Sequence, residues 1–95
     1  MSPGGAEATG RPTTPDETRL IEPLRAIWSE VLHRDVAPDD DFIGLGGGSL
    51  HAIRIVHRVE EHYATELSVR SVLETRTVAA MARHLAQVLD SDRRP

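Results

Sequence analysis

Residues 49–63, SLHAIRIVHRVEEHY, carry the clearest periodic pattern in the chain and decide its fold. At about 100° per residue, apolar side chains fall on one stripe of a helix and polar side chains on the opposite face. The stripe consists of Ala52, Ile55, Val56, Val59 and Tyr63. This spacing predicts an amphipathic helix over 49–63 that buries the stripe in a core. Because serine is a favoured N-cap and Ser49 follows a run of glycines, we expect Ser49 to cap this helix.

Two aliphatic residues of this helix, Leu50 and Ile53, lie outside the apolar stripe. They project from the polar flank of the first turn beside Ser49, with Arg54 next to them. Single exposed apolar residues are ordinary on protein surfaces, so the pattern alone fits a docking patch and an indifferent surface equally. By the same pattern alone, Ser49 is most simply a helix cap.

The segment before residue 34 also has helical periodicity. Its apolar residues step by threes and fours: Leu20, Ile21, Leu24, Ile27, Trp28, Val31 and Leu32. This predicts a helix over 20–33. Pro23 fits such a helix only in the first turn, where its missing N–H has no partner to lose.

Two more helices are predicted after residue 68, a short one over 69–74 and a longer one over 78–90. Ser68 and Thr77 are the expected caps. Nothing in the chain alternates with a period of two, so we predict no strand. The predicted fold is all-α, a small four-helix bundle with three longer helices and one short one.

Residues 34–48 contain Pro38, an acidic triplet and four glycines, and they predict a long loop. Its apolar residues are spaced to hold the loop against the core: Val36, Phe42, Ile43 and Leu45. We therefore expect an ordered, functional loop.

The chain of 95 residues is predicted to form one domain over 19–90. The segments 1–18 and 91–95 are rich in Gly, Pro and polar residues, and we expect them to be disordered. The absence of cysteine excludes disulfides and thiolate metal sites. With a net charge of −4 and no long apolar run, the chain is expected to be cytoplasmic and to bind neither nucleic acid nor membrane.

Catalytic patterns are weak in this chain. The run GLGGGS resembles a phosphate-binding loop but lacks the Walker lysine, and Ser49 stands where GxGxxG needs its third glycine. The G-x-S-x-G pattern of hydrolases is not met. The five histidines form no i,i+4 pair, so no metal site is predicted. The residues alone point to no enzyme.

The stretch DDDFIGLGGGSLHAIRIVHRV, residues 39–59, resembles the core motif of peptidyl carrier proteins, the thiolation domains of nonribosomal peptide synthetases. The motif places are filled by Asp41, Phe42, Leu45, Gly46, Gly47, Ser49 and Leu50, with Gly48 in the variable place before the serine. The stretches AIWSEVL (26–32) and ELSVRSVLETRTVAAMARHL (66–85) are similar to the other helices of the family. The resemblance covers about residues 20–89.

This resemblance implies a carrier and not an enzyme. A phosphopantetheinyl transferase would move 4′-phosphopantetheine from coenzyme A to the hydroxyl of Ser49. An adenylating enzyme would load an aminoacyl or acyl thioester on this arm, and condensation or tailoring enzymes would use it. Leu50, Ile53 and Arg54 would then form the docking face for these partners. We expect a monomer that acts in trans as a free-standing carrier in natural-product biosynthesis.

Four residues depart from the family pattern: Ile43, Gly44, Gly48 and Arg76. Arg76 stands where proline is common, and we expect it to matter only for the start of the last helix. Two alternatives stay open. The first is an acyl carrier protein of polyketide or fatty-acid synthesis, although its second helix is typically acidic and this one carries Arg54 and Arg58. The second is a helical interaction or DNA-binding module, which the net charge of −4 disfavours.

Overall fold

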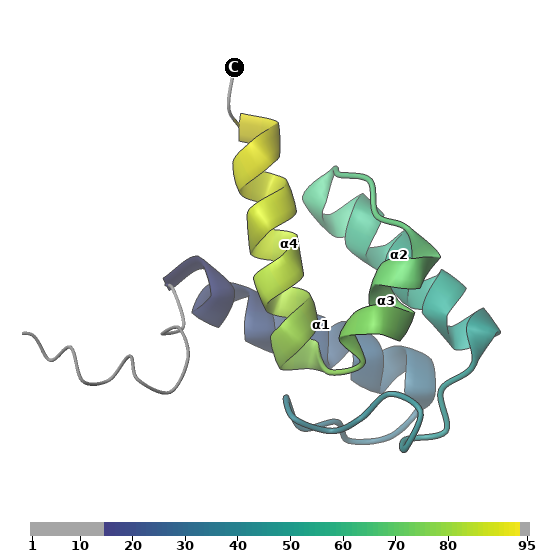
Figure 1. The fold of residues 1–95 in the computed structure, drawn as a ribbon. Coiled ribbons are helices and arrows are strands. Elements are labelled where there is room, and N and C mark those ends of the chain that lie inside the picture. The colour runs from purple at the N-terminus through teal and green to yellow at the C-terminus, as the bar shows by residue number, and fades with distance from the viewer. Residues whose placement is uncertain (1–14, 94–95) are drawn as a thin grey trace, which may run out of the picture.

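The computed structural model describes residues 15–93, which form four helices and no strand (Figure 1). In chain order the helices are α1 (Pro15–Leu32), α2 (Ser49–Tyr63), α3 (Val69–Thr75) and α4 (Val78–Arg93). The predicted all-α class, with three longer helices and one short helix, is confirmed. The disorder predicted for 1–14 and for 94–95 falls outside the described residues. The disorder predicted for 91–93 is wrong, because α4 continues without a break to Arg93.

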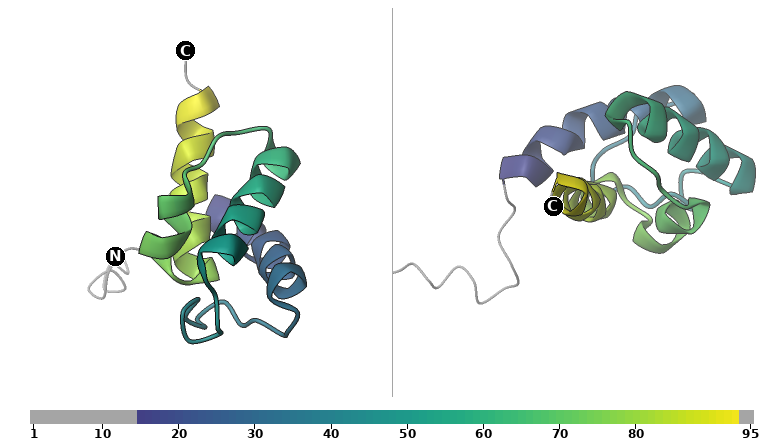
Figure 2. Two further views of the ribbon diagram at one scale, coloured as in Figure 1. Left: turned by 90° about the vertical axis from the view of Figure 1, so that its right-hand side faces the viewer. Right: turned by 90° about the horizontal axis from the view of Figure 1, so that it is seen from above.

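The long α1 packs against both α4 and α2, and the short α3 packs against α2 and α4. The loop 33–48 closes one end of the bundle and leads from α1 to the start of α2 (Figures 1 and 2). The junction between α3 and α4 lies at the same end as this loop, as Figure 1 shows. The chain is therefore arranged so that the loop, the start of α2 and the end of α3 are neighbours.

The core is built from the apolar faces that the sequence predicts. The stripe of α2 is buried at Ala52, Ile55, Val56 and Val59, and Tyr63 is half-buried at the end of the helix. The other fully buried large side chains are Leu24, Trp28, Phe42, Val72, Val78, Met81 and Leu85. Every helix and the loop contribute to this cluster, so one core holds the whole described chain together.

The start of α1 differs from the prediction. The helix begins at Pro15, five residues before the predicted start at residue 20, so the end of the predicted tail is helical. Proline is tolerated at the first helical position, and acidic residues in the first turn favour the helix dipole. Glu17 is only 5% exposed, and its carboxylate lies 3.9 Å from Nε of Arg83 on α4. This partner is distant in the sequence, which is why local periodicity places the start too late.

Pro23 is also placed differently, since it lies inside α1 and not in its first turn. A proline there cannot donate the backbone hydrogen bond that the helix would otherwise make. The helix continues through it because Leu20 and Leu24 are buried on either side of Pro23. Tertiary packing therefore outweighs the local cost of the proline.

The caps of the last two helices are confirmed. The Ser68 hydroxyl accepts a hydrogen bond from the backbone N–H of Ser71, at 3.3 Å. The Thr77 hydroxyl accepts one from the backbone N–H of Ala80, at 3.1 Å. Over residues 15–93, no helix combines the length and the apolar content needed to cross a membrane.

Candidate functional site

Ser49 is exposed and is the first residue of α2, not its N-cap. The N-cap is Gly48, whose extended backbone (φ −138°, ψ −174°) precedes the helix and whose carbonyl accepts the first helical hydrogen bond from Ala52, at 3.0 Å. The N–H of Gly48 donates to Nδ1 of His51, at 3.2 Å. The predicted cap is therefore wrong by one residue: Gly48 holds the N-cap position, and the ring of His51 accepts from its backbone N–H.

This start leaves the Ser49 hydroxyl available. The first helical bond comes from Ala52, so the N–H groups of Ser49, Leu50 and His51 have no acceptor within the helix. These three groups and the positive end of the helix dipole attract negative charge. A phosphate ester on Ser49 would be attached to the first of the three residues whose N–H groups are free. The residues present therefore fit such a group.

At two of the three positions directly before Ser49, the structure requires a glycine. Gly46 has φ +89°, a left-handed backbone conformation that residues with a side chain rarely adopt. A Cβ at Gly47 would lie 2.5 Å from the ring of Phe42, which is too close for any side chain. At Gly48 a Cβ would meet nothing within 4 Å, so the space beside Ser49 is open. The glycine run thus shapes the loop at two positions and leaves access to the serine at the third.

Phe42 anchors the loop to the core. Its ring is fully buried and meets Trp28 of α1 edge to face, with ring centroids 5.3 Å apart. Trp28 in turn donates from Nε1 to the sulfur of Met81 on α4, at 3.4 Å. The buried contact with Trp28, which itself binds α4, holds the loop against the core, as predicted.

The other apolar residues of the loop differ in how deeply they are buried. Val36 is buried and Leu45 is half-buried against the core, as expected. Ile43 is 51% exposed, so its predicted contact with the core is wrong. Backbone hydrogen bonds from Leu45 to Phe42 and from Gly46 to Ile43 fold this segment into tight turns. In such turns Phe42 takes the core position and its neighbour points away.

Asp41 lies at the centre of the polar contacts of the loop. Its Oδ2 accepts a hydrogen bond from the N–H of Gly44 at 2.9 Å, and its two oxygens accept from Nε and Nη2 of Arg76 at 2.8 and 3.1 Å. The hydrogen bond from Arg76, followed by that from Gly44, lowers the pKa of Asp41 below its ordinary value of 3.8. The same hydrogen bond raises the pKa of Arg76.

The role of Arg76 was underestimated from the sequence. We expected it to matter only for the start of α4, yet its guanidinium binds the loop and its carbonyl accepts from the N–H of Phe42, at 2.7 Å. Arg76 and Asp41 lie 35 residues apart, and no local pattern joins them.

The residues expected to dock partners are exposed. Leu50 is 66% exposed and Ile53 49%, and Arg54 beside them is exposed as well. Of the residues that the structure describes, only two other large apolar side chains are exposed, Ile43 in the loop and Leu73 in α3. Leu73 is not among the docking residues predicted from the sequence; it follows the buried Val72 and therefore points off the buried face of a short helix.

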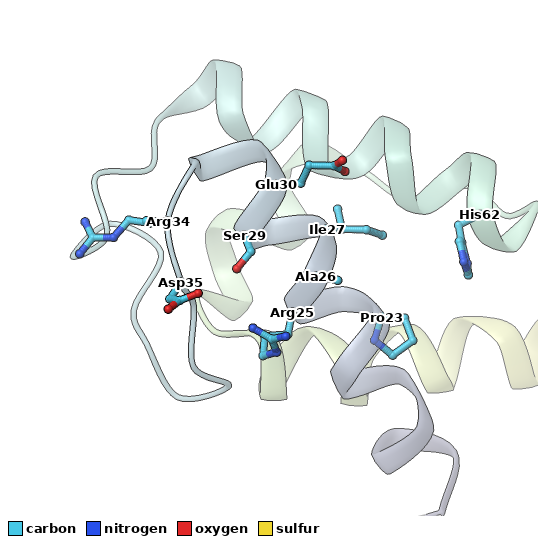
Figure 3. A pocket seen from close by; sticks show the side chains of 9 residues that line it. All are labelled: Pro23, Arg25, Ala26, Ile27, Ser29, Glu30, Arg34, Asp35 and His62. Carbon is cyan, nitrogen blue, oxygen red and sulfur yellow. The ribbon is translucent and has the colours of Figure 1, made fainter.

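A shallow groove runs along α1 to the end of α2, where Figure 3 shows side chains of both helices. Pro23, Ser29 and His62 are among its lining residues. Arg25, which also lines it, is held by Glu22, and Arg34 donates to the carbonyl of Leu45. Over residues 15–93, no cluster of three or more metal-ligating side chains is present.

Comparison with known proteins identifies the family. The family described as "Phosphopantetheine attachment site" matches residues 22–85. A dimodular nonribosomal peptide synthase of Bacillus subtilis (strain 168) is 42% identical over 82 residues, which are 84% of this chain and 3% of the synthase. The chain spans between 1% and 6% of the length of the curated relatives it matches.

Solved structures show the same fold. BlmI, a type-II acyl-carrier-protein from Streptomyces verticillus involved in bleomycin biosynthesis, is 45% identical with a TM-score of 0.74, covering 93% of this chain and 99% of BlmI. A structure of the phosphopantetheine transferase Sfp with coenzyme A and a peptidyl carrier protein matches at 28% identity and a TM-score of 0.66, covering 80% of this chain and 95% of that chain. The chain therefore belongs to the phosphopantetheine-attachment-site family, as a carrier domain of the nonribosomal peptide type and not a catalyst.

Proposed function

We propose that Ser49 carries the 4′-phosphopantetheine arm and that the chain presents an aminoacyl or acyl thioester on it to partner enzymes of nonribosomal peptide biosynthesis. The observation that carries this proposal is the position of Ser49 as the exposed first residue of α2. Its hydroxyl is not the cap of α2, because Gly48 holds the N-cap position. Open space at Gly48 gives a transferase access to it.

Attachment exchanges one bond for another. The Ser49 oxygen forms a bond to the phosphorus that bears pantetheine in coenzyme A, and the bond from that phosphorus to adenosine 3′,5′-bisphosphate breaks. The serine proton passes to a base of the transferase. The contribution of this chain is to expose the hydroxyl and to place the free N–H groups at the start of α2 beside the negative charge of the ester.

We infer that partners dock on the first turns of α2. Leu50, Ile53 and Arg54 are exposed beside Ser49, and Ile53 and Arg54 line a shallow hollow together with His57 and Arg58. Such a surface suits small, transient interfaces, which let several enzymes visit one carrier in turn. A transferase is the first partner, in line with the related carrier solved with Sfp. Adenylating, condensation and tailoring enzymes are the partners that nonribosomal chemistry then requires.

The test is intact-protein mass spectrometry after incubation with coenzyme A, Mg²⁺ and a broad-specificity phosphopantetheinyl transferase. We expect the wild type to gain one phosphopantetheine and Ser49→Ala to gain none. Because Gly48 caps α2, Ser49→Ala should keep its fold and change stability by no more than about 0.5 kcal/mol, checked by circular dichroism.

Ser68→Ala is the matched control, since Ser68 is another exposed serine at the start of a helix. It should accept the arm like the wild type. Modification of Ser49→Ala would show that the site lies elsewhere. A folded wild type that gains no mass would contradict the proposal as a whole.

An acyl cargo is the second candidate, and the similarity to BlmI, an acyl-carrier-protein by its description, favours it. The exposed Arg54 and Arg58 on α2 differ from the acidic helix typical of the acyl branch and support an aminoacyl cargo. Loading the holo protein with adenylating enzymes and amino acids, against acyl-coenzyme A donors, separates the two. The expected monomeric state, action in trans and cytoplasmic location stay predictions.

A further inference from the structure

Arg76 occupies a backbone conformation that is costly for an arginine. It is the C-cap of α3 with φ +64° and ψ −13°, in the left-handed region, and its N–H donates to the carbonyl of Val72 at 3.0 Å. Glycine is the usual residue at this place because it has no Cβ to strain. A side chain kept at such a position calls for an explanation in what the side chain contacts.

The Arg76 side chain crosses from the end of α3 to the loop. Its Nε and Nη2 donate to the two carboxylate oxygens of Asp41, at 2.8 and 3.1 Å, in the two-pronged geometry that guanidinium and carboxylate favour. The pair joins segments that are otherwise connected here by the bond from Phe42 N–H to the Arg76 carbonyl. Arg76 therefore binds two successive residues of the loop, Asp41 through its side chain and Phe42 through its backbone carbonyl.

From Asp41 a continuous series of contacts leads to Ser49. The second oxygen of Asp41 also accepts from the N–H of Gly44, which closes the turn. The carbonyl of Phe42 accepts from the N–H of Gly47 at 2.9 Å, and Gly47 packs against the Phe42 ring. Gly48 and Ser49 follow directly, so the orientation of this turn sets the direction in which α2 begins.

Arg70, an arginine within α3, provides a contrast. Arg70 pairs with Glu74 four residues later, with Nε 3.2 Å from the carboxylate and both side chains largely exposed. That pair stays within one helix. Exposed ion pairs contribute little to stability, so neither pair is needed to hold the fold.

We propose that Arg76 is a positioning residue for Ser49: through Asp41 it fixes the turn that aims the serine hydroxyl at an incoming transferase. This inference rests on the proposed function of Ser49. It predicts an effect on the rate of attachment and on the order of the loop, with no corresponding loss of stability.

Arg76→Gly is the decisive variant. Glycine keeps the left-handed C-cap and the backbone carbonyl that binds Phe42, and it removes the side chain with its guanidinium. We expect the melting temperature to stay equal or rise, and kcat of a broad-specificity transferase to fall on the order of tenfold at unchanged KM. Backbone amides of Gly44, Leu45 and Gly47 should exchange faster with solvent, as followed by NMR.

Asp41→Asn approaches the same contact from the other side, because the amide keeps an oxygen for the N–H of Gly44 but loses the charge. Its loss of kcat should match that of Arg76→Gly, and the double variant should lose no more than either. Arg70→Gln is the control and should leave kcat, KM and amide exchange unchanged. Ile53→Asp, on the docking face, should instead raise KM.

Wild-type kcat and wild-type amide exchange in Arg76→Gly would overturn the proposal, as would an equal loss in Arg70→Gln. Losses in the two single variants that add in the double variant would show that the two residues act independently. Failure of the proposed function is distinguishable, since the wild type would then gain no arm at all. Amide exchange needs no transferase and tests the contact between Arg76 and the loop in either case.

Discussion

Gly47 is a residue at which the loop backbone lies directly against a buried ring. A Cβ there would lie 2.5 Å from the ring of Phe42, and this ring is fully buried against Trp28 and has no room to withdraw. Gly47→Ala should therefore destabilise the fold by about 1–3 kcal/mol, the cost of overpacking a filled core. Urea unfolding followed by circular dichroism measures the loss.

Gly48→Ser is the control for this substitution. The neighbouring position has an extended backbone and open space, so Gly48→Ser should change stability by no more than about 0.5 kcal/mol. Equal stability of Gly47→Ala and the wild type would contradict the packing argument.

At this scale the sequence locates the candidate serine but not its surroundings. The glycines and the helical pattern place Ser49 at the start of a helix, because both signals are local. The cap itself is missed by one residue, since it depends on the ring of His51 reaching back to Gly48. The contact between Asp41 and Arg76 joins residues 35 apart and is visible only in the fold.

Among the elements, α1 carries the clearest local defect. Pro23 lies in its interior, where it withholds a backbone donor from the carbonyl four residues earlier. Pro23→Ala should restore this bond and stabilise the protein by about 1–3 kcal/mol. The higher conformational entropy of the unfolded variant reduces this gain. A higher midpoint of urea unfolding is the expected result.

Pro38→Ala, in the loop, is the control for Pro23→Ala. No helix runs through Pro38, and its carbonyl accepts from the N–H of Ala79 whatever the side chain. Pro38→Ala should only loosen the unfolded chain and cost up to about 1 kcal/mol. A loss of stability in Pro23→Ala would show that the proline suits α1 better than its hydrogen bonding indicates.

The helices differ in how far their sequences determine them. α2 begins and ends where predicted, because its apolar stripe and its glycines are strong local signals. α4 runs beyond the predicted end at residue 90 to Arg93. At the start of α1 the buried Glu17 lies against Arg83 of α4, a contact between two ends of the described chain that local periodicity does not show. Periodicity predicts the middles of helices, and contacts between them decide where they end.

In the whole molecule, one side chain joins the parts that present the site. Trp28 is fully buried on α1, meets Phe42 of the loop edge to face and donates to the sulfur of Met81 on α4. Trp28→Ala should leave a cavity among these elements and cost about 3–5 kcal/mol. Since a domain of this size has only about 5–15 kcal/mol of stability, the variant should be close to unfolding.

Trp28→Phe separates the two contacts of this side chain. It keeps an aromatic ring against Phe42 but removes the N–H that reaches Met81, so we expect a smaller loss, about 1–2 kcal/mol. Circular dichroism must follow the unfolding, because Trp28 is the only tryptophan of the chain. If Trp28→Ala were as stable as Trp28→Phe, Trp28 would not be what joins the loop to α1 and α4. If Trp28→Ala is instead less stable than Trp28→Phe, as we expect, the packing of the whole core holds the loop and Ser49 in place.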